Sequence, residues 1–191
     1  MDKLLEEVRR CELCRAHLPQ APKPVLAASA TSRIVIVGQA PGSRVQATGI
    51  PWNDPSGELL RQWMGVDRDS FYNAARIALV PMGFCYPGKG RSGDLPPRPE
   101  CAPQWHPRLF AQMPQRRLTL LIGQYAQRHY LGARAGKTLT ETVRRHADYL
   151  PEFFPLPHPS PRNRLWLRRN PWFDAEVVPR FRALLQELLD D

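Results

Sequence analysis

The sequence predicts an α/β fold, namely a three-layer α/β/α single domain built on a short, mostly parallel four-stranded sheet. Three observations support this prediction: four short apolar runs occur along the chain, helical patterns separate them, and two of the runs end at Gly/Pro turns. Strands that alternate with helices pair in parallel, because the crossover helices return the chain over the sheet. A chain of 191 residues can bury one sizeable core.

The N-terminal part of the chain, residues 1–18, is expected to form a short helix whose inward face is Leu4, Leu5 and Val8. A Pro/Ala-rich linker is expected over residues 19–32. Everything from residue 1 to residue 191 is assigned to a single domain, since no repeat or low-complexity tail divides it.

The strands and the remaining helices follow from apolar periodicity. A continuous β-branched run is typical of a strand buried on both faces. Strands are expected at 33–37, 76–80, 118–122 and 153–156. Helices are expected at 56–65, 124–131 and 170–190. The segment 85–101 is dense in Gly, Pro and charge and is expected to be a loop.

The charge balance is strongly basic: 27 Lys and Arg face 18 Asp and Glu, the formal net charge is +9, and only four of the cations are lysines. Arginine donates paired hydrogen bonds to phosphate, so this balance favours a nucleic-acid partner over the alternative of a merely solubilising surface. No apolar run approaches about 18 residues, so no membrane span is expected. The charged N-terminus lacks a signal-peptide core, and a cytoplasmic location is expected.

Four cysteines form a second pattern. Cys11 and Cys14 are a C-x2-C pair, and after 70 further residues Cys85 and Cys101 form a C-x15-C pair. Two-residue spacing lets both sulfurs face one metal, and the expected location disfavours disulfides. The cysteines are therefore interpreted as metal ligands, with buried free thiols as the alternative. Four thiolates suit a [4Fe–4S] cluster or zinc, and the spacing does not distinguish the two.

Two short loops carry the strongest functional signal. Residues 38–42 read Gly-Gln-Ala-Pro-Gly and residues 158–163 read His-Pro-Ser-Pro-Arg-Asn, and each follows a predicted strand. Ligands of open α/β sheets bind beyond the carboxyl ends of the strands. We therefore expect the two loops to form a slot with His158 on one wall.

Together the two loops and the cysteine arrangement resemble the uracil-DNA glycosylase superfamily, and most of all its iron–sulfur (family 4-like) branch. The resemblance extends from Cys11 to the His158 loop, and the Leu121-Ile122-Gly123 strand end also fits it. It implies a base-excision repair enzyme that hydrolyses the N-glycosidic bond of a flipped-out deaminated base, with uracil the first expectation. It also implies a [4Fe–4S] cluster rather than zinc, DNA as the partner and a monomer.

The resemblance assigns roles to the first loop and to His158. His158 would stabilise the departing base anion, and Gly38, Pro41 and Gly42 would line the base pocket. Gln39 stands where this branch usually has glutamate, and Ala40 where related enzymes have a water-activating aspartate. Because alanine cannot act as a base, the water would be held by backbone groups or by Gln39. The nearby carboxylates of Asp54 and Glu58 could substitute for the missing carboxylate, although an exposed-surface or helix-start role is expected for both.

Base recognition and DNA contact are implied in the same way. Trp52 lies at the position of an aromatic residue that stacks on the flipped base. The usual base-reading asparagine is missing from the segment before Cys85, so backbone groups of Met82 and Gly83 are expected to replace it. Arg162 would be the wedge that enters the DNA. The further DNA-contacting residues would be Ser160, Asn163, Arg164 and Arg168.

Two alternatives remain open from the sequence. The first is a catalytically silent nucleic-acid-binding protein on the same fold with a structural metal centre, which the alanine at position 40 and the missing asparagine favour. The second is an iron–sulfur redox protein. The intact His158-Pro159-Ser160 motif favours the glycosylase.

Overall fold

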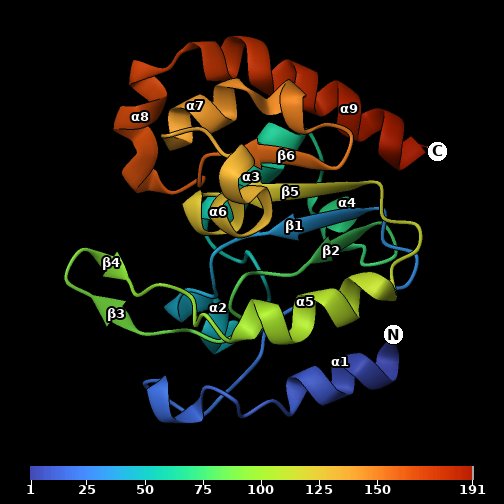
Figure 1. Cartoon of the computed structure of the whole chain (residues 1–191), viewed down its shortest axis with the longest axis vertical. Coiled ribbons are helices and arrows are strands. Elements are labelled where there is room, and N and C mark those ends of the chain that lie inside the picture. Colours follow the sequence, from blue (N-terminus) through green and yellow to red (C-terminus); the bar gives the residue numbers. More distant parts are fainter. Residues whose placement is uncertain (191) are drawn as a thin grey trace.

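The computed structural model of the chain describes residues 1–190 and contains one four-stranded sheet (Figure 1). Its strands follow the spatial order β2-β1-β5-β6, and every neighbouring pair is parallel. Their bounds are β1 Ile34–Val37, β2 Ile77–Leu79, β5 Leu118–Ile122 and β6 Phe153–Leu156. The predicted α/β class, the four strands and the parallel pairing are all confirmed.

Helices cover both faces of this sheet, because alternate residues of each strand point to opposite sides. Ile34 and Ile36 of β1 belong to one buried cluster, whereas Val35 and Val37 belong to the other. The first cluster contains residues of α3 (Pro55–Met64) and α9 (Val178–Asp190). The second contains residues of α1 (Asp2–Arg9), α5 (Cys101–Ala111) and α6 (Gln124–Leu131). Figure 1 shows α9 and α5 on opposite sides of the sheet, which gives the three predicted layers.

The bounds of helix α3 follow from the residues at its two ends. Asp54 is its N-cap, and the side chain accepts a hydrogen bond of 2.9 Å from the Gly57 N–H. Pro55 occupies the first helical position, where no N–H is needed. Gly65 ends the helix in the left-handed conformation, with φ of 68°. The helix-start role expected for Asp54 is confirmed.

The N-terminal region differs from its prediction. Helix α1 ends at Arg9 rather than near residue 18, although Leu4, Leu5 and Val8 are buried as expected. A single 3-10 turn, η1 (Arg15–His17), follows. The expected linker is also packed rather than free, since Ala27 forms an antiparallel bridge with Leu79 of β2.

The segment before and after Cys101 is the largest departure from the sequence prediction. Residues 85–101 contain a small antiparallel hairpin, β3 (Lys89–Gly90) and β4 (Gly93–Asp94), rather than only loop. Helix α5 then starts at Cys101 although Pro103 and Pro107 lie within it. Because proline disfavours a helix interior, this helix was not predicted, although Cys101, Trp105 and Leu109 have the apolar spacing of a helix.

The C-terminal helix predicted at 170–190 is present in two parts, because a π-helix, η5 (Phe173–Val177), precedes α9. The remaining elements are short and were not predicted. Among residues 1–190, no helix combines the length and apolar character needed to cross a bilayer. The other elements are α2 (Ser43–Thr48), α4 (Arg68–Tyr72), α7 (Leu139–Arg144), α8 (Arg164–Arg169), and the 3-10 turns η2 (Gly132–Arg134), η3 (His146–Tyr149) and η4 (Pro161–Asn163).

Candidate active site

The two predicted loops meet at the carboxyl ends of β1 and β6 and line one cavity of about 550 Å³. This size is typical of a small-molecule site, and its place beyond the strand ends is the expected one for a parallel sheet. The structure brings together ten of the residues singled out from the sequence. They are Gly38, Gln39, Ala40, Pro41, Gly42, Trp52, His158, Ser160, Arg162 and Asn163.

Trp52 and His158 form the aromatic wall of this cavity. Their rings are stacked, with centroids 5.8 Å apart and planes inclined by 29°. Trp52 also lies against Gly38, where an added Cβ would come within 2.6 Å of the indole Cζ2. Its backbone is in the left-handed region with φ of 56°, which is rare for a large residue and recurs at functional sites. At Gly57 a Cβ would overlap the Trp52 carbonyl oxygen, so that glycine is required.

The His158 ring is partly exposed, and its Nδ1 atom is buried with no hydrogen-bond partner among the described residues. Burial lowers the pKa of His158 below its usual value, and the Asp54 carboxylate opposes this by raising it. The imidazole is therefore neutral near pH 7, so that one ring nitrogen donates and the other accepts. The Asn163 side chain donates a hydrogen bond of 2.7 Å to the His158 carbonyl oxygen and fixes the loop.

The first loop is held by the segment that follows β2. The Met82 N–H donates to the Gly38 carbonyl oxygen at 2.8 Å, and the Gly83 N–H donates to the Gln39 carbonyl oxygen at 3.0 Å. Both residues are buried, and neither lines the cavity. The structure therefore does not bring Met82 and Gly83 into the pocket, and their N–H groups are already engaged.

The pocket contains polar residues that the sequence analysis missed. Gln124 and Tyr125 line it from the start of α6, directly after Gly123 at the end of β5. Ser92, Gly93 and Asp94 line it from the β3–β4 hairpin. The strand end at Gly123 was a visible signal for the first pair, because neighbouring parallel strands end at the same edge. Nothing in the sequence placed the hairpin residues there.

Arg162 spans the mouth of the pocket. Its Nη1 donates a hydrogen bond of 2.9 Å to the Ser92 carbonyl oxygen of the hairpin. At Gly93 a Cβ would overlap this guanidinium group, so that glycine admits the close approach. Arg164 and Arg168 lie on α8, are exposed and do not line the cavity. Figure 1 shows the hairpin projecting at the end of the molecule where α2 lies.

The four cysteines also converge. Cys11, Cys14, Cys85 and Cys101 line one small cavity of about 20 Å³, at the N-terminal end of α5. Burial raises the pKa of the Cys85 thiol to about 11 and that of the Cys101 thiol to about 12, and the neighbouring cysteines add to both. Within the part of the chain that the structure describes, no three side chains are already placed as a set of metal ligands.

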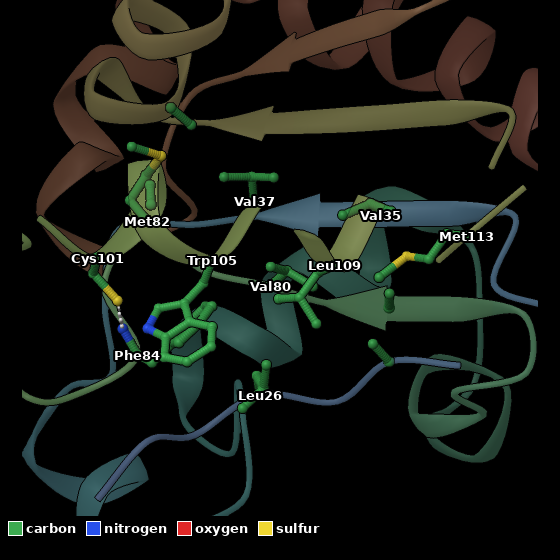
Figure 2. Packing of buried hydrophobic residues seen from close by; sticks show 14 of the residues in the cluster. Leu26, Val35, Val37, Val80, Met82, Phe84, Cys101, Trp105, Leu109 and Met113 are labelled. Atoms are coloured by element: carbon green, nitrogen blue, oxygen red, sulfur yellow. Dashed lines mark hydrogen bonds between the residues drawn. The ribbon is translucent and has the colours of Figure 1, made fainter. Parts of the chain in front are cut away.

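Two N–H groups lie close to Cys101. The Phe84 backbone N–H donates to the Cys101 sulfur at 3.4 Å (Figure 2). Trp105, one helical turn further along α5, directs its indole nitrogen toward the same side in Figure 2. That nitrogen is buried and has no hydrogen-bond partner among residues 1–190. Both are donors that a sulfur-rich group would satisfy.

A comparison with protein families gives one match. The model described as the uracil DNA glycosylase superfamily matches residues 26–182. The matched region includes both pocket loops, the β3–β4 hairpin, Cys85 and Cys101. Cys11 and Cys14 lie outside it.

Proposed function

We propose that this chain, which belongs to the uracil DNA glycosylase superfamily, hydrolyses the N-glycosidic bond of a deaminated base. Uracil is the first expected substrate. The nucleotide would flip out of DNA before the bond is broken. The observation that carries the proposal is the pairing of His158 with Trp52 in a cavity of about 550 Å³. A stacking surface and a hydrogen-bond donor are the two things that a flipped base requires.

His158 is proposed to act as the donor to the leaving base. Negative charge develops on the base oxygen as the C1′–N bond breaks, and a donor aimed there binds the transition state more tightly than the ground state. A neutral imidazole, which the lowered pKa supports, can donate one hydrogen bond without adding a buried charge. The Asn163 contact to the His158 carbonyl oxygen holds the loop in place during this step.

The base edge is proposed to meet Gln124 rather than Met82 or Gly83. The amide of Gln124 has both a donor and an acceptor, as an asparagine has, and it lies in the cavity. Gln124 is exposed at the first position of α6. The amide is therefore available to a ligand.

DNA is the proposed partner, bound by a monomer in the cytoplasm. The net charge of +9 supports attraction to phosphates, and Arg164 and Arg168 are exposed beside the His158 loop. Arg162, which lines the pocket and is exposed, is proposed to be the wedge that enters the DNA where the nucleotide has left the stack.

The experiment that tests the proposal is base release from labelled oligonucleotides. Each carries one uracil, hypoxanthine, xanthine or normal base, single-stranded or paired, and alkali converts any abasic site into a strand break. Release from uracil, lost in H158A while the variant still binds DNA, is expected. No release from any lesion would contradict the proposed activity.

A silent DNA-binding protein is the second candidate function. One observation favours it: Ala40 has no ionisable group, and the Gln39 amide already donates to the Leu95 carbonyl oxygen at 3.3 Å. In that case the same oligonucleotides would be bound tightly and remain intact.

A [4Fe–4S] cluster is proposed for the cysteine cavity, with zinc as the alternative. Cys11, Cys14, Cys85 and Cys101 would hold it, and the donor set of four thiols fits either group. The Phe84 N–H and the unpartnered indole N–H of Trp105 would supply hydrogen bonds to sulfur. When bound, the group would tie the N-terminal segment to α5, which is a structural role.

Metal analysis of the purified protein separates these possibilities. Iron and acid-labile sulfide with a brown colour would support the cluster, whereas zinc alone would support the alternative. C11S and C14S should lose the metal and much of the thermal stability, while S70A, remote from this cavity, should lose neither. Metal-free wild-type protein of undiminished stability would contradict the proposal.

A further inference from the structure

Two carboxylates line the active-site cavity in the described part of the chain, Asp54 and Asp94. Asp54 already has a structural role, because its Oδ1 caps α3 by accepting from the Gly57 N–H. A capping carboxylate is stabilised where it is and would lose that contact if it turned to a substrate. Asp94 has no such role in a helix, and its side chain is exposed in the pocket wall.

The carboxylate of Asp94 lies over the end of the first loop. A Cβ added to Gly42 would stand 3.5 Å from the Asp94 Oδ2 atom. Gly42 closes the loop whose side chains at positions 39 and 40 cannot act as a base. The hairpin therefore places a carboxylate beside the loop that lacks one.

Contacts on each side of Asp94 hold it in this position. Asp94 pairs with Lys89 across the hairpin, and the Leu95 N–H donates to the Gly88 carbonyl oxygen at 2.8 Å. Burial, and then the charge of the Asp94 carboxylate, raise the pKa of Tyr86. A base held in a fixed position beside the reacting groups is what acid–base catalysis requires.

We propose that Asp94 is the catalytic carboxylate that binds and activates the attacking water. This inference rests on the proposed glycosylase function and deepens it, since it identifies the base that the first loop does not provide. Arg162 assists by holding the hairpin through the Ser92 carbonyl oxygen, which keeps Asp94 beside the first loop.

The step balances without any further reactant. The water oxygen bonds to C1′ of the sugar as the C1′–N bond breaks, and the bonding electron pair leaves on the base. One water proton passes to the Asp94 carboxylate, and the base anion is stabilised by the donor on His158. Asp94 then returns the proton to the base or to solvent, which restores the free enzyme.

Single-turnover base release compares four variants with the wild type on the best lesion. D94N should reduce the rate at least about 100-fold, the usual scale for a general base, with DNA affinity and melting temperature unchanged. D54N keeps a capping side chain and should lose far less. E152Q removes the same charge at an exposed position outside the pocket and should match the wild type. D94E retains the carboxylate and should recover at least tenfold over D94N.

Different outcomes would overturn different claims. If D94N stays within about threefold of the wild type, or if D54N is the slower variant, Asp94 is not the base. Equal rates for D94N and D94E would show that the position rather than its carboxylate matters, which also overturns the inference. Each of these results leaves the glycosylase itself intact, whereas a wild type that releases no base overturns the proposed function and this inference with it.

Discussion

Trp52 is stacked on His158 with ring centroids 5.8 Å apart, although the two residues are more than 100 positions apart in the sequence. The contact joins the loop before α3 to the loop after β6. It needs three unusual local features: a left-handed Trp52, a glycine beneath its ring and a glycine beside its carbonyl oxygen. Strain of this kind is retained where the surrounding structure fixes it, so the stack is a preformed part of the site.

Replacing Gly38 with alanine should damage the site more than the fold. The new methyl group would lie 2.6 Å from the Trp52 ring and push the indole away from its stacking position. We expect base release to fall about 5- to 150-fold, because a base-stacking aromatic contributes about 1–3 kcal/mol. E152Q, at an exposed position outside the pocket, is the control and should match the wild type. Equal rates for the two variants in single-turnover assays would contradict this account.

Removing the cap of α3 should lower stability. D54A leaves the Gly57 N–H without its acceptor, which typically costs about 1 kcal/mol of unfolding free energy. D54N should retain most of that stability, because asparagine caps as well as aspartate. Urea titrations of the three proteins measure the difference, and a D54A protein as stable as D54N would show that the cap contributes nothing.

Arg162 should control the mobility of the β3–β4 hairpin. R162A removes the hydrogen bond to the Ser92 carbonyl oxygen, and few other contacts restrain the exposed residues 91 and 92. Hydrogen exchange over residues 88–95 is expected to become faster in R162A and to stay unchanged in R168A, where the arginine lies on α8. The same exchange rate in both variants would rule out the restraint.

His106 should make the fold sensitive to acid. Its Nε2 donates to the Pro81 carbonyl oxygen at 2.9 Å, and its Nδ1 accepts from the Tyr130 hydroxyl, so the ring is neutral. Burial lowers the pKa of His106 from 6.5 to about 4. The unfolded chain therefore binds a proton between these values that the folded chain does not, and stability falls as pH drops through that window.

The expected size of this effect is about 2 kcal/mol between pH 7 and pH 5. H106Q removes the titrating group, and its unfolding free energy should depend less on pH over the same range, even if it is lower throughout. Urea titrations at the two pH values decide the matter. A variant with the same pH dependence as the wild type would assign the effect to other groups.

The sequence predicted those parts of the site that follow buried strands. Apolar runs specify β1 and β6, and each ends at a Gly/Pro loop, so the convergence of Gly38 and His158 followed from parallel pairing alone. Trp52 was indicated only by the family resemblance, since no local pattern in the sequence places it in the pocket. The strand and loop signals are local, and parallel pairing of the strands brings the loops that carry them to the same edge of the sheet.

The parts that were missed depend on tertiary contacts. The two residues of each hairpin strand have no apolar alternation, so nothing indicated that Asp94 would reach Gly42. Helix α5 was hidden by its prolines, although it covers one face of the sheet together with α1 and α6. Met82 and Gly83 were expected to face the pocket, but their N–H groups hold the first loop instead.

The bridge between Ala27 and Leu79 has a consequence for self-association. Without the segment around Ala27, the outer side of β2 would expose backbone N–H and C=O groups that another chain can pair with. Removing residues 1–28 should therefore promote aggregation through this sheet edge, even if the active-site loops are untouched. The N-terminal segment thus covers a sheet edge as well as carrying two of the cysteines.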